Sequence, residues 1–516
     1  MSPRLRELPI SLLAESADGQ LSSPSTPKFL QIAAALVADI RRGRLRPGDQ
    51  LPGSRALALS LGVHRNTVLA ALQELIAQGW LHAAAGRGTY VAADLPTQRK
   101  AASRGPSRAR PKTGAALRRP GFSLPAGLAV ALADERALWS EPVPRGTLAL
   151  LGGLPDLRLL PTAALARAYR RVMAVRGGEL LRYDDPQGDP GLRTALMRLL
   201  CQHRGLSGDA ADLLVTRGSQ MAVYLIAQAL LRPGDVVAVE ALGYPPAWAA
   251  LRQAGAELVP IPVDAAGIDV AALCRLAATR RLRAIYLTPH HQYPTTAMLS
   301  QARRLQLLAL AQRQRIAILE DDYDHEFHYQ GRPVLPLASA DRGGVVVYIG
   351  TLSKLLAPGL RIGFVWAPQA LLARLTALRV ILDRQGDHGV QRAVAELIDD
   401  GEIERHAWRC RRVYAARREH LASLLQRDLA DELRFTLPAG GMALWAQVAD
   451  GISVADWQAG ARREGVLFQP GGRFEFHGRP LAAMRLGFAC LNEDEQHEAV
   501  RRLRRALPRA VASRRR

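Results

Sequence analysis

Lys354 has the sequence surroundings of a lysine that bonds covalently to a cofactor. It follows an apolar, β-branched run (346–351) and comes just after two hydroxyl residues, Thr351 and Ser353. Arg361 lies seven positions further on. A lysine amine forms a Schiff base with an aldehyde once its environment favours the neutral form. Nearby hydroxyls and an arginine are suited to holding a phosphate group. By itself the pattern is also that of a surface lysine, so its meaning depends on the rest of the chain.

Three further segments carry groups that an aldehyde cofactor of this kind needs. The run 317–323, AILEDDY, ends a predicted strand in acids and a tyrosine. Pyridoxal phosphate requires a carboxylate that keeps its ring nitrogen protonated, and it benefits from a phenol bonded to its ring oxygen. The segment 216–220, TRGSQ, follows a predicted strand and opens a helix, so its amides and Ser219 can seat a phosphate. Tyr244, which follows another strand, can stack on the pyridine ring.

Strand-like and helix-like segments alternate from about residue 145 onward. Short apolar or β-branched runs occupy 236–242, 257–263, 284–289, 316–323 and 345–351. Helical segments such as 301–315 lie between some of them. This alternation predicts an α/β fold with a mainly parallel sheet. Ligands of such folds bind at the carboxyl ends of the strands.

A small unit before residue 94 has the pattern of a winged helix-turn-helix. Apolar periodicity predicts helices over 29–43, 54–63 and 64–80, and only a short turn separates the last two. This arrangement lets the third helix enter a DNA major groove. Residues 81–93 predict a short hairpin, which would be the wing.

Side chains of this small unit have the chemistry for DNA contact. Arg65 can donate to guanine, Asn66 can make paired bonds to adenine, and Thr67 suits phosphate or a thymine methyl. Arg55 starts a helix, where a cation and free amides both favour phosphate. Arg87 at the wing tip can reach the minor groove or the backbone. The alternative is a three-helix packing unit with surface arginines.

The excess positive charge lies mostly outside the large unit. The net charge is +22, and residues 94–120 hold eight Lys or Arg against one Asp. Residues 501–516 hold eight Arg and no acid. Basic ends on a near-neutral body indicate a polyanionic partner, foremost nucleic acid, although arginine runs that only aid solubility are the alternative. Residues 94–120 also lack aromatics and are rich in Ala, Pro, Ser and Gly, which predicts a flexible linker.

Length and composition exclude several classes of protein. The chain of 516 residues has room for two to four domains at ~150 residues each. Its 48% hydrophobic and 22% charged residues exclude a wholly disordered chain, a collagen or a coiled coil. It has neither 18 consecutive apolar residues nor a secretory signal, so we expect a cytoplasmic protein without a membrane partner. Four scattered cysteines predict neither a disulfide framework nor a metal site.

Two families are similar to this chain. The small unit resembles the GntR family, on the motifs 43–48, 51–55, 61–68 and 86–91. The order of the segments around residues 216–220, Tyr244, 317–323 and 346–364 resembles the fold-type-I aminotransferases, which use pyridoxal phosphate. As a whole the chain resembles the MocR subfamily of GntR-type transcription regulators. The resemblance implies an N-terminal tail (1–23), a winged helix (24–93), a flexible basic linker (94–140), an aminotransferase class I/II-like domain (141–508) and a basic tail (509–516).

The resemblance also implies roles for individual residues. Lys354 is the Schiff-base lysine, Asp321 pairs with the cofactor's ring nitrogen and Tyr323 with its ring hydroxyl. Tyr244 stacks on the ring. Arg485 clamps the carboxylate of an amino-acid effector, a task suited to a bidentate guanidinium. The residues implied to hold the cofactor phosphate are Ser219, Gln220, Thr351, Ser353 and Arg361.

Some positions carry implications beyond one subunit or depart from the enzyme pattern. Tyr183 matches a tyrosine that reaches the phosphate of a neighbouring subunit, which implies a homodimer, typically head-to-tail. The loop 290–296, HHQYPTT, replaces the Asn-Pro-Thr-Gly turn of plain aminotransferases, so His291 and Gln292 are expected effector contacts. Thr296 stands where Gly is usual. The run 440–443, GGMA, looks more like an enzyme than like many regulators, which keeps catalysis open.

Three functions therefore remain open. The first is a transcription regulator that binds double-stranded operator DNA. Its large domain would form an external aldimine with an amino compound, and the closure of that domain would change. The second is a working aminotransferase with an accessory DNA-binding module. The third is a sensor of pyridoxal phosphate itself. The helix-turn-helix favours the first or third, because a free-standing enzyme has no need of it.

Overall fold

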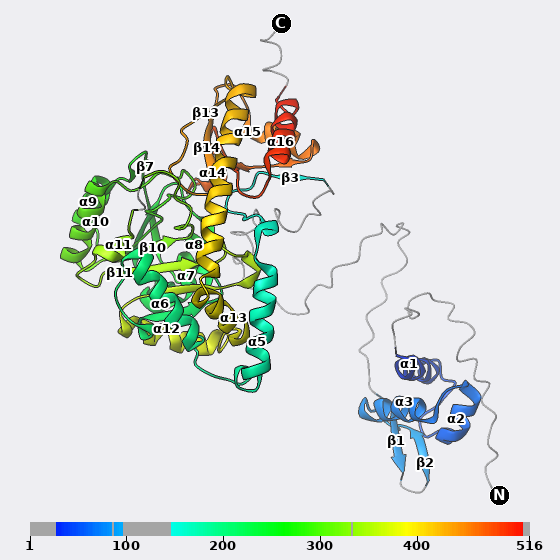
Figure 1. Ribbon diagram of the computed structural model, residues 1–516. Helices are drawn as coiled ribbons and strands as arrows, with labels where there is room; N and C mark the ends of the chain where they lie inside the picture. Colours follow the sequence, from blue (N-terminus) through cyan, green and yellow to red (C-terminus); the bar gives the residue numbers. More distant parts are fainter. Residues whose placement is uncertain (1–26, 85–86, 96–145, 332–333, 509–516) are drawn as a thin grey trace, which may run out of the picture. The chain divides into compact units, whose positions relative to one another are not determined.

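The chain forms two units in the computed structural model, Met1–Phe122 and Ser123–Arg516 (Figure 1). The structure describes residues 27–84, 87–95, 146–331 and 334–508. Both predicted tails and nearly all of the predicted linker lie outside the described residues. The predicted domain boundaries therefore stay predictions.

The small unit folds as the predicted three helices and a hairpin. Its elements are α1 (Lys28–Arg41), α2 (Ser54–Leu61), α3 (Arg65–Ala77), β1 (Leu81–Ala84) and β2 (Gly88–Val91). Apolar side chains from all three helices share one core, in which Leu36, Leu57 and Val68 are buried. Helix α2 ends at Gly62, whose φ of 61° is left-handed and favours glycine. The tight turn into α3 confirms the predicted helix-turn-helix.

The wing is a two-stranded hairpin tied to the loop before α2. Strands β1 and β2 pair antiparallel, with Leu81 opposite Val91. The Gln50 side chain donates a hydrogen bond to the Arg87 carbonyl over 2.8 Å, and the Tyr90 hydroxyl donates to the same carbonyl over 2.8 Å. These bonds fix the Arg87 backbone at the end of the wing.

A seven-stranded sheet forms the centre of the large unit and confirms the predicted α/β class. The strand order is β4-β12-β11-β10-β9-β5-β6; β12 runs antiparallel to the other strands, which are parallel to one another. The strands are β4 (Leu213–Thr216), β5 (Val236–Glu240), β6 (Glu257–Ile261), β9 (Leu282–Leu287), β10 (Ala317–Asp322), β11 (Val346–Thr351) and β12 (Gly363–Trp366).

Helices cover both faces of this sheet (Figure 1). Neighbouring residues of one strand enter different cores, Ile318 on one side of β10 and Leu319 on the other. Both faces are therefore dry, which explains why the strands are continuous apolar runs. One core includes α7 (Ser219–Leu230), α8 (Pro245–Gln253) and α12 (Gln369–Leu382). The other includes α6 (Pro190–Arg204), α9 (Val270–Thr279), α10 (Gln301–Gln314), α13 (His388–Asp399) and α14 (Glu402–Asp428).

A second, antiparallel sheet lies nearer the C-terminus, with the order β13-β14-β17-β16. Its strands are β13 (Leu433–Phe435), β14 (Ala443–Val448), β16 (Gln469–Pro470) and β17 (Ala483–Gly487). Short strands β3 (Leu148–Ala149) and β15 (Val466–Leu467) pair beside it. The other elements are α5 (Thr162–Leu180), α11 (Leu337–Ala340), α15 (Val454–Arg463), α16 (Glu493–Arg505), β7 (Val263–Asp264) and β8 (Gly267–Ile268), with short 3-10 turns at Leu157–Leu159, Ala210–Asp212, Pro358–Leu360 and Gly471–Phe474.

A glycine lets the start of the large unit approach the second sheet. The Gly487 amide donates a hydrogen bond to the Leu150 carbonyl over 2.9 Å. A Cβ at Gly487 would lie 2.3 Å from the carbonyl oxygen of Leu151, so a larger residue would push this segment away. The approach brings Gly152 and Gly153 toward Arg485 and Lys354.

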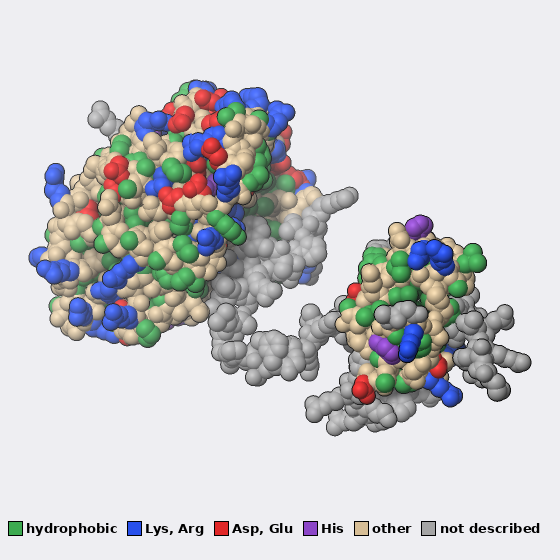
Figure 2. Space-filling view, turned by 90° about the horizontal axis from the view of Figure 1, so that it is seen from below, with side chains coloured by type: hydrophobic (Ala, Val, Ile, Leu, Met, Phe, Trp, Pro, Cys, Tyr) green, Lys and Arg blue, Asp and Glu red, His purple; other side chains and the backbone are tan. Residues whose placement is uncertain are grey.

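The surface of the large unit carries charge of both signs. Figure 2 shows basic and acidic side chains intermixed on one of its faces. Helix α14 has 27 residues, but charged side chains are spread along it. None of the helices in the described ranges has both the length and the apolar character that crossing a bilayer requires.

Candidate functional site

The carboxyl ends of four mutually parallel strands bring most of the predicted cofactor residues to one edge of the seven-stranded sheet. Asp321 is near the end of β10, and Lys354 follows the end of β11. Ser219 begins α7 just after β4, and the loop after β9 carries His291 and Gln292. This is the edge at which α/β proteins bind ligands.

The Lys354 amine lies in surroundings that favour its neutral form. Its side chain is half-buried. Burial lowers the pKa of the Lys354 ammonium to about 8, and the nearby charge of Arg485 acts in the same direction. A Cβ at Gly153 would lie 3.3 Å from Lys354 Nζ, so glycine leaves room around the amine. Lys354 is also one of four lysines in the sequence, and the other three lie before residue 113.

The lowered pKa predicts how cofactor capture depends on pH. Only the unprotonated Lys354 amine attacks an aldehyde, and its share rises as the pH approaches a pKa of about 8. We expect the rate at which apoprotein takes up pyridoxal phosphate, followed by absorbance, to rise with pH and level off above about 8. In Arg485→Met the curve should move to higher pH, because a neighbouring positive charge is lost. A rate that still climbs steeply at pH 10 would show that the amine titrates as an ordinary lysine.

Asp321 offers a buried carboxylate oxygen that lacks a partner among the described residues. Its Oδ2 accepts a hydrogen bond from the Tyr286 hydroxyl over 2.7 Å, whereas Oδ1 has none. Burial raises the pKa of Asp321 to about 6. An unsatisfied buried oxygen is costly, and a protonated ring nitrogen would satisfy it. Asp321 therefore fits the carboxylate that pyridoxal phosphate requires.

Two tyrosines predicted to contact the cofactor ring lie at the same edge. The Tyr323 hydroxyl donates a hydrogen bond to the His291 carbonyl over 2.9 Å. Tyr244 precedes α8, and its ring meets that of Tyr293 edge-on at 5.4 Å between centroids. Both side chains are half-buried, so they have surface available to a ligand. Their contacts with the ring stay predictions.

The predicted phosphate residues surround the start of α7. A Cβ at Gly218 would lie 3.1 Å from the Arg361 guanidinium, which places that cation against the first turn of the helix. The Thr351 and Ser353 hydroxyls are 3.0 Å apart and buried. No side chain of the described residues caps α7, whose N-terminal amides attract an anion. Hydroxyls, a guanidinium and a helix N-terminus together form a site that fits a phosphate.

Two other predicted cofactor residues, Gln220 and Tyr183, make their contacts outside this phosphate site. Gln220 donates through Nε2 to the Pro246 carbonyl over 2.8 Å, and its buried Oε1 has no partner in the described part of the chain. Tyr183 is 78% exposed, with the guanidinium carbon of Arg384 over its ring at 4.6 Å. An exposed ring is what the predicted contact with a neighbouring subunit needs.

Arg485 is a fully buried cation with donors to spare. Within the described residues its Nε and Nη2 have no partner, and its Nη1 makes one long bond of 3.4 Å to Gln469 Oε1. Its guanidinium carbon lies 4.5 Å from the centroid of the Tyr293 ring. A Cβ at Gly152 would lie 1.9 Å from Arg485 Nη1, so glycine is needed for this placement. Such a guanidinium fits a carboxylate, which would satisfy two donors at once.

The loop 290–296 is buried and largely occupied with its own bonds. His291 Nδ1 lies 2.8 Å from Asp324 Oδ1. Gln292 donates to the carbonyls of Leu242 and Tyr293, and its oxygen accepts from the amide and hydroxyl of Thr295. The predicted effector contacts of these two residues stay predictions. Thr296 has φ 62°, in the left-handed region that explains why glycine is usual there.

Sequence reasoning missed a second buried acid that shapes this loop. Glu240, at the end of β5, accepts hydrogen bonds from the Thr288 hydroxyl over 2.9 Å and the Thr288 amide over 3.2 Å. Burial raises the pKa of Glu240 to about 8. Its position directly after VVAV in a predicted buried strand was the available signal, since an acid there must have partners.

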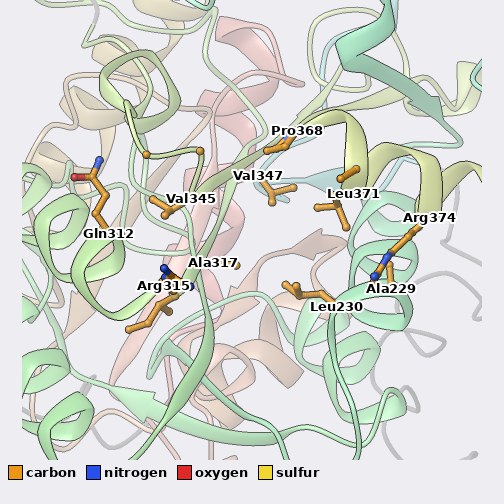
Figure 3. A pocket seen from close by; sticks show the side chains of 14 residues that line it. Ala229, Leu230, Gln312, Arg315, Ala317, Val345, Val347, Pro368, Leu371 and Arg374 are labelled. Atoms are coloured by element: carbon orange, nitrogen blue, oxygen red, sulfur yellow. The ribbon is translucent and has the colours of Figure 1, made fainter.

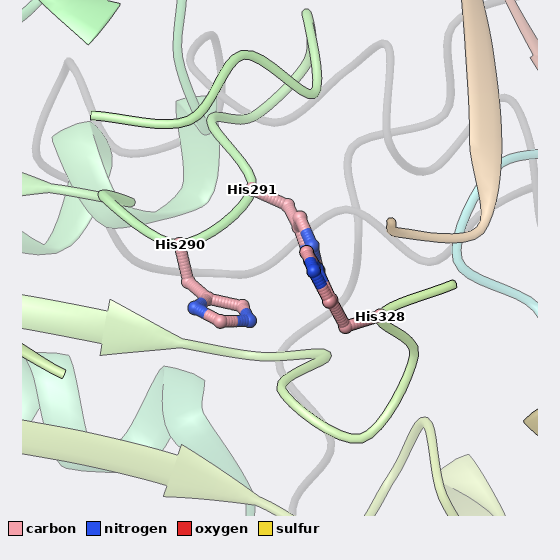
Figure 4. A group of neighbouring side chains, drawn as sticks. All are labelled: His290, His291 and His328. Carbon is pink, nitrogen blue, oxygen red and sulfur yellow. The ribbon is translucent and has the colours of Figure 1, made fainter. Parts of the chain in front are cut away.

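Sequence reasoning also missed a cluster of histidines beside the site. His290, His291 and His328 lie close together on the loops after β9 and β10, although no metal site was expected (Figure 4). Burial holds the pKa of His290 well below its usual value. No short motif joins positions 290 and 328, so only the fold brings them together.

A separate hollow of about 570 Å³ lies at the opposite edge of the sheet (Figure 3). It is lined by residues at the amino ends of β10 and β11, including Ala317 and Val345. Arg315 and Arg374 stand on two sides of an otherwise mainly apolar lining. The hollow contains none of the predicted site residues and is not part of the cofactor site.

The small unit presents its predicted DNA-binding side chains to solvent. Arg55, Arg65, Asn66 and Arg87 are exposed, and Thr67 is half-buried. The Arg65 Nε donates to the Ser54 hydroxyl over 3.2 Å, which links the starts of α2 and α3. The exposed N-terminus of α3 is the part of a recognition helix that meets base edges.

Two arginine variants should separate base contacts from phosphate contacts. We expect Arg65→Ala to weaken binding to a selected operator duplex by ~1–3 kcal/mol and to relax the preferred sequence. Arg55→Ala should weaken operator and random duplexes alike and reduce the salt slope by about one. Fluorescence anisotropy on both duplexes over a range of salt measures both effects. An unchanged preferred sequence in Arg65→Ala would refute the assigned recognition helix.

The fold and the site define a class of protein. A seven-stranded, mostly parallel sheet carries a lysine of lowered pKa, a buried carboxylate with a free oxygen and a phosphate seat at one edge. This is the arrangement of fold-type-I proteins, whose cofactor is pyridoxal 5'-phosphate. When bound, that cofactor supplies an aldehyde that exchanges a lysine amine for the amine of a ligand.

Both units of the chain match known protein families. Residues 153–503 match the model of aminotransferase class I and II, and residues 28–91 match that of the bacterial regulatory proteins of the gntR family. The probable rhizopine catabolism regulatory protein MocR of Rhizobium meliloti is 32% identical, covering 93% of this chain and 94% of its own length. The HTH-type transcriptional regulator TauR of Rhodobacter capsulatus is 33% identical, covering 91% and 94%.

A solved structure matches the large unit. It is LysN, the α-aminoadipate aminotransferase of Thermus thermophilus, complexed with N-(5'-phosphopyridoxyl)-L-leucine. It is 31% identical, covers 72% of this chain and 94% of its own, and has a TM-score of 0.67. The chain therefore belongs to the MocR subfamily of GntR-type transcription regulators, in which a winged helix is joined to an aminotransferase class I and II domain.

Proposed function

We propose that this protein is a transcription regulator that senses an amino compound through pyridoxal phosphate bound at Lys354. The amino compound would take the place of the Lys354 amine on the cofactor, and the resulting change would alter the affinity of the winged helix for operator DNA. A ligand shifts DNA binding only if it prefers one of two conformations of the protein. Because a protein that binds an operator acts where the chromosome lies, we expect this protein in the cytoplasm.

One observation carries the choice of a regulator over an enzyme. The match to MocR and TauR runs through both units, whereas the match to LysN covers the large unit. The exposed side chains at the start of α3 have no purpose in a free-standing aminotransferase. Retention of both units in relatives named as regulators therefore supports a DNA-directed role.

The residues of the cleft suggest the class of effector. Arg485 supplies buried donors that lack partners among the described residues, so it would bind a carboxylate. Lys354, once released from the cofactor, would be free to accept a proton from the incoming ammonium. An amine and a carboxylate held at the same time describe an amino acid or a close analogue. Burial, together with the charge on Arg485, lowers the pKa of Lys354 to about 8, so a larger share of the amine is neutral and able to take part in this exchange.

A working aminotransferase is the second candidate. Lys354, Asp321 and Arg485 are the groups that transamination would also use, and LysN, an aminotransferase, is 31% identical. A third possibility is that pyridoxal phosphate itself is the effector. These three functions use the same residues of the site. They differ in whether the protein turns over substrate and in which ligand, if any, changes its affinity for DNA.

Exposed apolar side chains support the proposal of a homodimer. Leu181 and Tyr183 after α5, and Ile381 at the end of α12, are 76%, 78% and 83% exposed. The two segments touch, because the Asp184 amide donates to Gln385 Oε1 over 2.7 Å. An exposed apolar patch of this kind commonly marks an interface. We propose that it forms the interface of a head-to-tail dimer, with Tyr183 reaching the neighbouring cofactor.

A charge in this patch should separate the subunits. We expect Ile381→Glu to convert the dimer to a monomer in analytical ultracentrifugation, because a carboxylate would be desolvated at the interface. Leu305→Glu is the matched control, since Leu305 is 58% exposed on α10, which is not part of the patch. A dimer that survives Ile381→Glu, or a monomeric wild type, would reject this interface.

A panel of amino compounds tests the proposed function. The holoprotein is titrated with each compound while its absorbance is recorded, and turnover with 2-oxoglutarate is measured in parallel. The regulator proposal expects one or a few amino acids to shift the spectrum without turnover at metabolic rates. Rapid, sustained transamination would favour the enzyme instead, and no response to any amino compound would favour the cofactor sensor.

A further inference from the structure

Three histidines converge in the interior of the large unit, and only one of them, His291, is among the predicted effector contacts. His290, His291 and His328 are buried, and each offers a nitrogen within 4.8 Å of those of the other two. The first two lie on the loop after β9 and the third on the loop after β10 (Figure 4). Three nitrogens around a zinc ion lie ~3.4 Å apart, so small ring rotations would bring these into a coordination sphere.

The histidine nitrogens are short of partners among the described residues. Both ring nitrogens of His290, Nε2 of His291 and Nδ1 of His328 are buried without a hydrogen bond. Buried polar atoms are normally satisfied, and each exception calls for an explanation such as an ion. A shared ligand would satisfy unpartnered nitrogens on three neighbouring side chains at once.

A carboxylate holds His291 in the orientation of a metal ligand. Its Nδ1 is 2.8 Å from Asp324 Oδ1, and both groups are buried. Donation from Nδ1 to this carboxylate leaves the Nε2 lone pair free. Metal-binding histidines commonly show this pairing, which fixes the tautomer and raises the basicity of the ligand.

A glycine packs directly against the ring of His291. A Cβ at Gly440 would lie 2.0 Å from His291 Nε2, so only glycine fits at this position without displacing the imidazole. The backbone around His328 is fixed as well, because the Tyr329 amide donates to the Ala439 carbonyl over 2.8 Å. Position 440 and the two histidine loops therefore form one rigid wall.

A cavity gives access to the cluster from outside. It has a volume of about 330 Å³, and His328 lines it together with His203, Glu326 and Trp408. Two arginines also line it: Arg204, whose charge is balanced by an ion pair with Glu326, and Arg411. An ion can therefore reach His328 without opening of the main core.

We propose that His290, His291 and His328 bind a divalent transition ion of the zinc class, with Asp324 as the partner that orients His291. Imidazole nitrogen is a preferred ligand of this class of ion. Three protein ligands leave one coordination position for water or a further ligand. The His291 carbonyl accepts a hydrogen bond from the Tyr323 hydroxyl. The ion would therefore also stabilise the loop that holds this tyrosine at the cofactor site.

Metal titration of the full-length holoprotein tests this site. Untagged protein is stripped with a chelator and titrated with Co²⁺, whose tetrahedral complexes absorb to the red of the cofactor, and Zn²⁺ is then added as competitor. We expect one equivalent of Co²⁺ per chain and its displacement by Zn²⁺. No such band in the stripped wild type, or a Zn²⁺ addition that leaves the band unchanged, would overturn the proposal.

Variants locate the ion. His328→Gln should weaken Co²⁺ binding at least 100-fold, and Asp324→Asn should weaken it roughly 10- to 100-fold. His203→Gln is the matched control, because His203 lines the same cavity but bonds to Glu404, and it should bind as wild type does. If His328→Gln fails to fold, His290→Asn replaces it. Equal affinity in wild type and the ligand variant, or equal loss in His203→Gln, would contradict the assignment.

Discussion

Replacement of Lys354 by Ala should abolish covalent attachment of the cofactor. Reduction with borohydride converts an imine to a stable amine, so the wild type should gain one phosphopyridoxyl group on the peptide that contains residue 354. The Lys354→Ala protein should gain none there and should lose its absorbance band near the visible edge on dialysis. Mass spectrometry after digestion and absorbance spectra measure both effects, and the expected loss is complete.

The scarcity of lysine makes this result easy to interpret. The other three lysines are Lys28, Lys100 and Lys112, and none belongs to the aminotransferase-like region. Lys28→Ala serves as the matched control and should leave both the band and the labelled peptide unchanged. A labelled peptide elsewhere, or a colourless wild type after reconstitution, would reject Lys354 as the point of attachment.

Loss of the Arg485 guanidinium should have the second largest effect. We expect Arg485→Met to weaken binding of a responsive amino acid by about 30-fold or more, because removing one partner of a buried charge pair costs ~2–5 kcal/mol. Spectral titration measures the affinity. The amine that corresponds to the same amino acid without its carboxylate should lose much less affinity, because for this ligand only the effect of Arg485 on the pKa of Lys354 is removed. Equal weakening of both ligands would mean that Arg485 supports the fold and not the carboxylate.

A substitution at Gly152 should also weaken binding of the amino acid, although Arg485 itself is kept. In Gly152→Ala the new Cβ would lie 1.9 Å from Arg485 Nη1 and must displace the guanidinium. Gly178→Ala in α5 is the matched control, because nothing lies within 4 Å of its Cβ position. If Arg485→Met and Gly152→Ala both weaken carboxylate binding while Gly178→Ala does not, the loss is due to the Arg485 contact and not to a general loss of structure.

The fold could largely be predicted from local patterns. The helices of the small unit have apolar residues at regular spacing and glycines at their ends, so Gly62 marks the end of α2. The strands of the large unit are apolar runs such as 345–351, because helices cover both faces of the sheet. The order of these segments then restricts the topology to a mainly parallel sheet.

The chemical site was partly accessible from the sequence for a related reason. Lys354 and Ser219 each follow a strand, Asp321 lies near the end of one, and the carboxyl ends of parallel strands share one edge. What sequence could not give is the partner of each group. Glu240 gains its role from Thr288, and the proximity of His290 to His328 exists only once β9 and β10 pair. Contacts between distant segments depend on side-chain packing, which local patterns do not encode.

A parallel titration of one sample most directly tests the central claim, that an amino compound bound at Lys354 changes DNA binding. The holoprotein is titrated with an amino acid that shifts the absorbance, and operator affinity is measured by anisotropy at each concentration. We predict that operator affinity changes about 5- to 150-fold with the same half-saturating concentration as the spectrum, and that Lys354→Ala shows neither response. An operator affinity that stays constant while the spectrum saturates would contradict the account.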